Sequence, residues 1–217
     1  MEQAILFDCD GVLLDSEGGL SIIAADVLHR NYNIPAKPED FLPFIGTGED
    51  SYIGGVVKKY GFEFTPDMKQ DVYVEYINKA HLYIKAFEGA KELIGKLRRE
   101  GYKVALASSA DEIKVEANLR IMDMQRSDFD AVITGSDIDK KKPDPEIYLV
   151  AAAKCNAAPE NCIVVEDAVS GVLAGMNAKM KIIGFTSSLS SAILEANGAA
   201  CTVSNYKELD EVIHEIE

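Results

Sequence analysis

The sequence predicts an α/β fold: a doubly wound parallel sheet with a small helical domain inserted after its first strand. Short, continuously apolar runs recur along the chain, and such runs are typical of strands buried on both faces of a parallel sheet. Helical patterns separate most of these runs, as in repeated βα units. After the first run this alternation stops, and the pattern over residues 17–86 is helical throughout.

The first strand is predicted over residues 4–7 and leads straight into Asp8-Cys9-Asp10-Gly11. The carboxyl ends of strands in an open α/β sheet border the crevice where ligands bind. Side chains alternate along an ideal strand, so Asp8 and Asp10 are expected on the same side. Two carboxylates that close repel each other unless a proton or a cation lies between them. Gly11 allows a sharp turn and a close approach to a ligand.

The helical stretch begins with an apolar stripe at helical spacing, which comprises Leu20, Ile23, Ala24, Val27 and Leu28. A second helix is predicted over residues 52–60. A third starts at Pro66 with Thr65 as its N-cap and runs towards Ala86. We therefore expect residues 17–86 to form a separate domain. Residues 1–16 and 87–217 would form the core, with hinges near residues 16–19 and 86–87.

Helix and strand alternate again from residue 87 onward. Further strands are predicted over residues 103–107, 131–134, 162–165, 181–184 and 200–203. Helices are predicted over residues 89–100, from about 111, and over residues 146–155, 170–178, 191–197 and 206–217. Gly101 marks a helix end, since glycine readily adopts the left-handed conformation there. The repeated order predicts helices on both faces of one parallel sheet.

Composition excludes several classes of protein. The formal net charge of the 217 residues is −14, which disfavours nucleic-acid binding because that needs a basic face. No apolar run approaches the roughly 18–20 residues of a membrane span. The first strand starts close to Met1, so no signal or transit peptide is expected. Four scattered cysteines without zinc spacing indicate free thiols in a reducing cytoplasm. We expect a cytoplasmic monomer.

Polar side chains follow three of the predicted strands, and a lysine lies on a loop after a fourth. They are Asp8, Asp10, Ser108, Ser109, Lys142, Glu166 and Asp167. Parallel strands bring these ends to one edge of the sheet. Four carboxylates there require a cation, and oxygen ligands without a nearby histidine or cysteine favour Mg²⁺. Hydroxyl groups and an ammonium facing that cation would suit a phosphate group.

Residues 8–16, Asp-Cys-Asp-Gly-Val-Leu-Leu-Asp-Ser, resemble the first motif of the haloacid dehalogenase-like phosphohydrolases. They are most similar to the branch that contains β-phosphoglucomutase and small sugar-phosphate phosphatases. Later segments match the other motifs of the family in the right order, so the resemblance covers essentially the whole chain. It implies a Rossmann-like core, with residues 17–86 forming a cap that closes over the active site.

The resemblance implies a role for each catalytic candidate. Asp8 matches the nucleophile, a carboxylate that can attack phosphorus and form an aspartyl-phosphate. Asp10 matches the general acid and base, which protonates the leaving alkoxide and later deprotonates water. Ser108 matches the hydroxyl residue of the second motif. Lys142 matches the lysine of the third motif, and both would hold phosphoryl oxygens and stabilise transition-state charge.

The resemblance also implies the metal site. Asp167 matches the metal carboxylate of the fourth motif, and Glu166 would be a second or water-mediated ligand. Asp8 would share the Mg²⁺ through its carboxylate, whereas Asp10 would bind it through its backbone carbonyl. The ion would bridge the nucleophile and the phosphoryl group and offset the charge that opposes attack.

Three candidates also have ordinary structural interpretations. Ser108 could be a helix N-cap, which is compatible with phosphate binding at that helix N-terminus. Glu166 could be structural. Lys142 ends a run of lysines at residues 140–142, and such runs are usually solvated faces. Its place before Pro143 favours it over the other two.

The cap would select the substrate through the loop at residues 46–50, with Gly46 and Thr47 as expected contacts. In the mutases a histidine just past the first motif restrains hydrolysis, and an arginine after the cap glycine grips the second phosphate. Leu20 and Glu49 stand at those places here. A carboxylate would repel a second phosphate and could not supply a bidentate fork. Both departures favour water as the phosphoryl acceptor.

The sequence therefore predicts a Mg²⁺-dependent phosphomonoester hydrolase that acts on a small phosphorylated metabolite such as a sugar or polyol phosphate. A β-phosphoglucomutase-type phosphosugar mutase is the alternative within the family. A non-catalytic binding or regulatory protein is the alternative of another class, and it would predict a damaged core motif. The core motifs here are complete.

Overall fold

The computed structural model describes residues 2–44 and 48–216. At its centre lies a six-stranded sheet in the order β5-β4-β1-β6-β7-β8, and all neighbouring strands are parallel. Its strands are β1 (Ala4–Phe7), β4 (Lys103–Ala107), β5 (Ala131–Ile133), β6 (Cys162–Glu166), β7 (Lys181–Phe185) and β8 (Cys201–Val203). The predicted parallel sheet is confirmed. Strands β4 and β5 lie on one side of β1, and the later strands β6, β7 and β8 lie on the other. This reversal of the strand order creates a crevice at the carboxyl end of β1.

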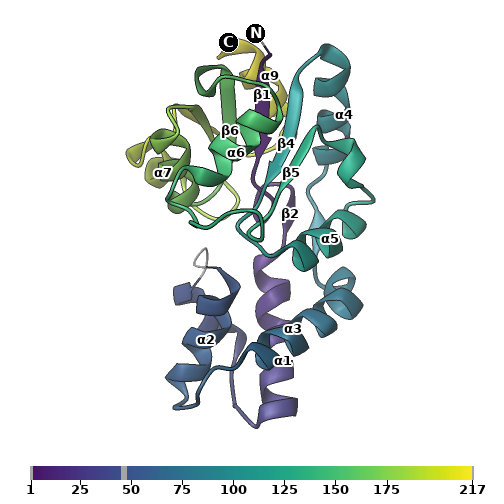
Figure 1. The fold of residues 1–217 in the computed structure, drawn as a ribbon, viewed down its shortest axis with the longest axis vertical. Coiled ribbons are helices and arrows are strands. Elements are labelled where there is room, and N and C mark those ends of the chain that lie inside the picture. The colour runs from purple at the N-terminus through teal and green to yellow at the C-terminus, as the bar shows by residue number, and fades with distance from the viewer. Residues whose placement is uncertain (1, 45–47, 217) are drawn as a thin grey trace.

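Both faces of the sheet are buried, as the doubly wound prediction requires (Figure 1). Ile5 and Phe7 of β1 belong to one apolar cluster, whereas Ala4 and Leu6 belong to the other. The first cluster includes side chains of α4 (Ala90–Glu100), α5 (Glu112–Ile121) and α9 (Tyr206–Glu215). The second includes side chains of α6 (Glu146–Lys154), α7 (Val169–Asn177) and α8 (Ser191–Ala196). Strand alternation thus divides the core into two layers.

Residues 17–44 and 48–82 contain the helices that lie below the sheet in Figure 1. We call them the helical insertion. Its elements are α1 (Glu17–Tyr32), the 3₁₀-helix η1 (Pro38–Phe44), α2 (Glu49–Lys59), α3 (Pro66–Lys79) and the 3₁₀-turn η2 (Ala80–Leu82). All five residues of the predicted apolar stripe on α1 are buried. Glu49 opens α2, three residues before the predicted start.

Two details of α3 differ from the prediction. Thr65 occupies the N-cap position, but its side chain accepts no capping hydrogen bond. The helix ends at Lys79 instead of continuing to residue 86, because the chain then forms the short strand β3 (Lys85–Ala86). β3 pairs antiparallel with β2 (Leu14–Asp15), so the two connections between the sheet and the helical insertion run side by side. The predicted domain bounds and hinges, at residues 16–19 and 86–87, lie next to this pair of strands. They remain predictions.

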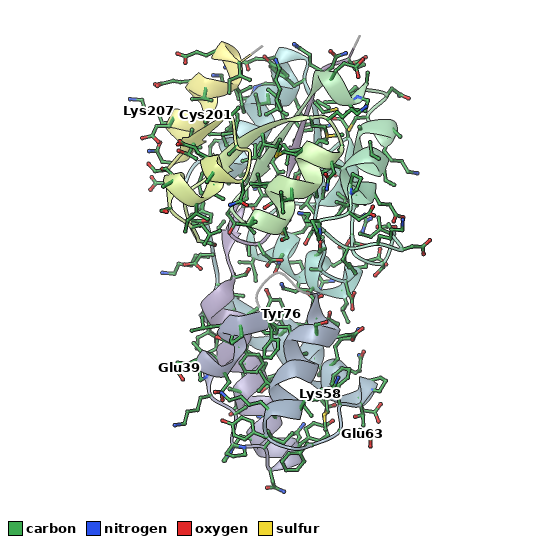
Figure 2. All side chains as sticks on the ribbon, turned by 90° about the vertical axis from the view of Figure 1, so that its left-hand side faces the viewer. Glu39, Lys58, Glu63, Tyr76, Cys201 and Lys207 are labelled. Carbon is green, nitrogen blue, oxygen red and sulfur yellow. The ribbon has the colours of Figure 1, made fainter. Side chains whose placement is uncertain are left out.

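Side chains of α3 bind the helix α5 of the core across the junction. The Tyr76 hydroxyl donates a hydrogen bond to Asn118 Oδ1 at 2.6 Å, and Figure 2 shows Tyr76 at the upper end of the helical insertion. The Tyr73 hydroxyl and Lys69 Nζ both donate to the Asp111 carboxylate, at 2.9 and 3.0 Å. These contacts hold the helical insertion against the part of the core that follows β4.

The cysteines are unpaired, as predicted. Cys9, Cys155 and Cys162 are buried thiols, and Cys201 is half-buried. Within residues 2–44 and 48–216, no helix combines the length and apolar character needed to cross a membrane.

Asp40 anchors η1 to the end of α2. Its carboxylate accepts hydrogen bonds from the backbone N–H of Lys37 at 2.8 Å and from the Tyr60 hydroxyl at 2.6 Å. Lys59 Nζ forms an ion pair with it at 2.5 Å. The hydrogen bonds from Lys59, Tyr60 and Lys37 lower the pKa of Asp40 from 3.8 to about 2. Because ionised Asp40 is favoured in the folded state, this group stabilises the fold above the pKa of the unfolded chain.

We predict that Asp40→Asn lowers the free energy of unfolding by about 1–2 kcal/mol at pH 7, since part of the shift is screened by solvent around Lys59. The difference from wild type should shrink as pH falls from about 4 towards the folded pKa of about 2. Urea denaturation at pH 7 and pH 3 measures it. The exposed neighbour Glu39→Gln serves as the control, and an Asp40→Asn difference that is equal at both pH values would contradict the assignment.

Candidate active site

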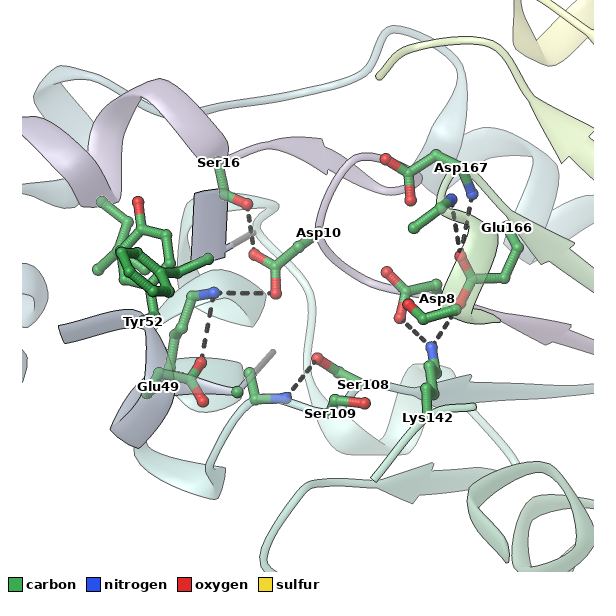
Figure 3. A pocket seen from close by; sticks show the side chains of 17 residues that line it. Asp8, Asp10, Ser16, Glu49, Tyr52, Ser108, Ser109, Lys142, Glu166 and Asp167 are labelled. Carbon is green, nitrogen blue, oxygen red and sulfur yellow. Dashed lines mark hydrogen bonds and ion pairs between the residues drawn. The ribbon is translucent and has the colours of Figure 1, made fainter. Parts of the chain in front are cut away.

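The seven predicted residues of the sheet edge line one pocket at the carboxyl ends of β1, β4 and β6, beside residues of the helical insertion (Figure 3). They are Asp8, Asp10, Ser108, Ser109, Lys142, Glu166 and Asp167. The predicted contacts Gly46 and Thr47 lie outside the described residues. The pocket is also lined by Glu49 and Tyr52 of α2 and by Leu20 of α1. It thus combines polar strand ends with side chains from a distant part of the sequence.

Three buried carboxylates meet at the end of β1. Oxygen atoms of Asp8, Glu166 and Asp167 lie within 4.8 Å of one another. Lys142 Nζ is 2.5 Å from Asp8 Oδ1 and 2.6 Å from Glu166 Oε1. This ammonium contacts two of the three carboxylates, which leaves negative charge in the cluster that a divalent cation would balance. The all-oxygen donor set fits a hard ion such as Mg²⁺.

Burial and the neighbouring carboxylates together shift the pKa of Asp8. Burial raises the pKa of Asp8 from 3.8 to about 7. The neighbouring Glu166 and Asp10 carboxylates add to the rise, whereas Lys142 opposes it. A further cation beside Asp8 would favour its ionised form, which is the form that can act as a nucleophile.

Glu166 is held by four hydrogen bonds. Its Oε1 accepts from Lys142 Nζ and from the Tyr148 hydroxyl, at 2.6 and 2.7 Å. Its Oε2 accepts from the backbone N–H groups of the two residues that follow, at 3.0 and 3.2 Å. A Cβ atom at Gly171 would lie 1.7 Å from Glu166 Oε1, so the start of α7 must carry a glycine to admit this carboxylate.

Asp167 is oriented by residues that the sequence did not single out. The hydroxyl groups of Ser187 and Ser188, which follow β7, donate to the Gly11 carbonyl and to Asp167 Oδ2 respectively. A Cβ atom at Gly11, where φ is 80°, would lie 1.9 Å from Asp167 Oδ2. The close approach therefore depends on glycine. Both serines follow a parallel strand at its carboxyl end, which is the signal that could have identified them.

The Asp10 carboxylate belongs to a second group, apart from the three clustered carboxylates. It accepts hydrogen bonds from Ser16 Oγ, from Lys114 Nζ at 3.0 Å and from Asn118 Nδ2 at 3.3 Å. β1 ends at Phe7, so the alternation expected to align Asp8 with Asp10 does not extend through the turn. Burial alone would raise the pKa of Asp10, but Lys114 and the Ser16 hydroxyl outweigh it and the pKa is lowered.

Lys114 joins Asp10 to the helical insertion. Its side chain is buried, and its Nζ lies 3.6 Å from Glu49 Oε1 on α2. Burial raises the pKa of Glu49, while Lys114 opposes the rise. Lys114 and Asn118 are not among the predicted site residues, because polar residues four apart on a helix usually indicate a solvated face.

The serines after β4 are also placed in the pocket. Ser108 Oγ accepts a hydrogen bond from the backbone N–H of Ala110 at 3.2 Å. Ser109 Oγ is buried and has no hydrogen-bond partner among the described residues. Both hydroxyl groups can still donate a hydrogen bond to a ligand.

The three consecutive lysines have different surroundings. Lys142 is in the site, with 5% of its side chain exposed. Lys141 Nζ donates to the carbonyl groups of Ser109 and Gly135, at 3.0 and 2.8 Å, and so ties the loops after β4 and β5 together. Lys140 has 71% of its side chain exposed. Of the three lysines, Lys140 is the one on a solvated face, whereas Lys142 lies in the pocket.

Known proteins resemble the chain over most of its length. The protein-family model described as haloacid dehalogenase-like hydrolase matches residues 5–185. A phosphorylated carbohydrates phosphatase of Thermotoga maritima is 30% identical over 202 residues, which are 91% of this chain and 93% of that protein. Protein SUPPRESSOR OF QUENCHING 1, chloroplastic, of Arabidopsis thaliana is 40% identical over 203 residues. That match covers 90% of this chain but only 19% of the plant protein.

Solved structures agree with these relatives. A hydrolase from Pseudomonas syringae superimposes with a TM-score of 0.81 at 25% identity, over 99% of both chains. Fold, motif order and family model all lead to one assignment. The chain belongs to the haloacid dehalogenase-like hydrolase family.

Proposed function

We propose that this phosphatase hydrolyses the phosphate ester of a small sugar or polyol in a Mg²⁺-dependent reaction, through an aspartyl-phosphate on Asp8. The observation that carries the proposal is the buried group of Asp8, Glu166 and Asp167 with Lys142 bridging two of them. The relative from Thermotoga maritima that is named a phosphorylated carbohydrates phosphatase supports a sugar or polyol substrate.

Asp8, Glu166 and Asp167 would hold the Mg²⁺ ion, together with the backbone carbonyl of Asp10 that the family resemblance implies. When bound, Mg²⁺ supplies positive charge that offsets the repulsion between the Asp8 carboxylate and the phosphoryl group. The hydrogen bonds to Glu166, and those from the serines after β7, hold the carboxylates in place.

In the first half-reaction, a carboxylate oxygen of Asp8 forms a bond to phosphorus as the bond between phosphorus and the alkoxide oxygen breaks. Lys142 and Ser108 donate hydrogen bonds to the phosphoryl oxygens and stabilise the charge on them. Asp10 gives its proton to the leaving alkoxide. The ion pair with Lys114 disfavours protonated Asp10, so we infer that substrate loosens this pair on binding.

In the second half-reaction, water attacks the phosphorus of the aspartyl-phosphate and the bond to Asp8 breaks, which releases inorganic phosphate. Asp10 takes the proton of that water. Its lowered pKa favours the carboxylate form that accepts the proton. The arrangement around Asp10 therefore supports the hydrolytic step most directly.

Hydrolysis is favoured over phosphosugar mutation by two residues of the pocket wall. Leu20 and Glu49, which replace the histidine and arginine expected in a mutase, both line the pocket and are 5% and 7% exposed. A buried carboxylate at Glu49 opposes the second phosphate that a mutase must hold. The binding-protein alternative would require a damaged nucleophile or phosphate site, and Asp8, Ser108 and Lys142 are all present in the pocket.

We further propose that the enzyme acts as a monomer in the cytoplasm. The four unpaired thiols suit a reducing compartment. The sheet edge and the helical insertion both contribute residues to the pocket.

We predict that Asp8→Asn lowers turnover on the order of a thousandfold or more, because a neutral amide cannot form the aspartyl-phosphate. The assay is phosphate release from sugar phosphates, polyol phosphates and p-nitrophenyl phosphate in the presence of Mg²⁺. Acid quenching with a radiolabelled substrate should trap phosphoenzyme in wild type and none in the variant. Retained turnover in folded, Mg²⁺-loaded Asp8→Asn would exclude Asp8 as the nucleophile.

A coupled assay for conversion of β-glucose 1-phosphate to glucose 6-phosphate, run beside it with the bisphosphate activator, separates hydrolysis from mutation. Phosphate release without isomerisation is expected. Isomerisation with little phosphate release would establish the mutase instead.

Asp10→Asn should slow substrates with poor leaving groups most, because an alkoxide needs a proton and p-nitrophenolate does not. We expect kcat/KM, which covers only the steps up to the aspartyl-phosphate, to fall about a hundredfold with an alkyl phosphate and only about tenfold with p-nitrophenyl phosphate. Steady-state kinetics on the two esters test this difference. Equal losses on both would argue against the acid role.

Lys142→Met should lower kcat/KM about a hundredfold, since it removes a charge that stabilises the transition state. It should also lower the melting temperature, because Asp8 and Glu166 would remain buried without their ammonium partner. Lys140→Met is the matched control and should stay close to wild type in both measurements. Comparable losses in the two variants would show that the effect is not specific to the pocket.

A further inference from the structure

Two buried side-chain atoms have no hydrogen-bond partner among the residues that the structure describes, and both belong to the pocket. They are Glu49 Oε2 and Ser109 Oγ. Buried polar atoms are nearly always paired, since leaving one unpaired costs free energy. A ligand that enters this pocket would supply the missing partners.

The chemistry of Glu49 shows which kind of hydrogen-bonding group the ligand must supply. The residue is 7% exposed and projects from the first turn of α2 into the pocket. Its Oε1 lies 3.6 Å from Lys114 Nζ, whereas its Oε2 is the unpaired atom. The nearby Lys114 ammonium favours the ionised form of Glu49, and an ionised carboxylate only accepts hydrogen bonds. The ligand must therefore present a donor there, such as a hydroxyl group.

The charges around Glu49 exclude another class of ligand. Figure 3 shows Glu49 and Tyr52 on one side of the pocket, and Lys142 with Asp8 on the other. On the Glu49 side, the single ammonium of Lys114 faces two carboxylates, those of Asp10 and Glu49. The net charge there is negative, so a second phosphate or a carboxylate on the substrate would be repelled.

The walls next to Glu49 are apolar. Leu20, Phe44 and Tyr52 line the same pocket. Aromatic and aliphatic side chains beside a few fixed polar groups are typical of sites for small metabolites. Such walls suit the C–H surfaces of a carbon chain whose hydroxyl groups reach Glu49 and Lys114.

Building on the proposed phosphatase function, we propose that Glu49 and Lys114 form a subsite for hydroxyl groups of the leaving group. Glu49 accepts from one hydroxyl and Lys114 donates to another. The subsite selects neutral, polyhydroxylated leaving groups and rejects those that carry a second anionic group.

Three open-chain, six-carbon esters test this directly. Sorbitol 6-phosphate is neutral beyond its phosphate and carries hydroxyl groups, 6-phosphogluconate adds a carboxylate, and hexyl phosphate has no hydroxyl groups. All three leave as alkoxides, so any disturbance of Asp10 affects them alike. We expect wild-type kcat/KM for sorbitol 6-phosphate to exceed each of the others about tenfold, the size of effect that one net hydrogen bond supplies.

Two substitutions of Glu49 separate hydrogen bonding from charge. Glu49→Leu should lower kcat/KM for sorbitol 6-phosphate about tenfold, mainly through KM, and change hexyl phosphate less than about threefold. Glu49→Gln should bring 6-phosphogluconate within about threefold of sorbitol 6-phosphate, because it removes the repelling charge. Glu63→Gln is the control, since Glu63 is an exposed glutamate at the far end of the helical insertion (Figure 2).

The contrary results are distinct from each other. Equal wild-type kcat/KM for the three esters, or equal losses on sorbitol and hexyl phosphates in Glu49→Leu, would overturn the subsite while the phosphatase function stands. A wild-type enzyme that hydrolyses none of these esters and no p-nitrophenyl phosphate would overturn the phosphatase function, and the subsite with it.

Discussion

The buried contact of Lys142 with Asp8 and Glu166 is the interaction on which the pocket depends. Without that ammonium, three carboxylates would lie within 4.8 Å of one another at the end of β1 with no cation between them. With it, two of the charges are bridged and Asp8 still has a pKa of about 7. The fold thus stabilises the cluster only partly, and this leaves Asp8 responsive to a bound cation.

Parallel strand order explains why so much of this site could be predicted from sequence. A buried parallel strand has an apolar run that is easy to recognise, and its polar residues at the carboxyl end must lie at the ligand crevice. That rule predicts Asp8, Ser108 and Glu166 on one edge of the sheet from the sequence alone. The core strands and helices are close to their predicted bounds for the same reason, since their periodicity is strong.

The rest depends on contacts between segments far apart in the sequence. Lys114 is buried beside Glu49, which α2 of the helical insertion brings to it. The spacing of residues along α5 gives no indication of this distant partner. Ser187 and Ser188 contact Gly11 and Asp167 only because β7 lies next to β6 in the sheet. The two-residue strands β2 and β3 are too short to show a pattern, and each is stable only through pairing with the other.

The pocket therefore has two lysines, Lys142 and Lys114, that pair with different groups of carboxylates. Lys142 contacts two of the three clustered carboxylates, and in the proposed reaction its side of the pocket would take up further positive charge and the phosphoryl group. Lys114 faces Asp10 and Glu49, and it favours the ionised form of Asp10, the acid–base group of the proposed reaction. A substrate that spans both sides must bring its anionic end to the first and an uncharged, hydrogen-bonding end to the second. This division follows from how the charges are paired. Asp10 would belong to both parts of the pocket, because it is the proposed acid–base group and it also pairs with Lys114 of the proposed hydroxyl subsite.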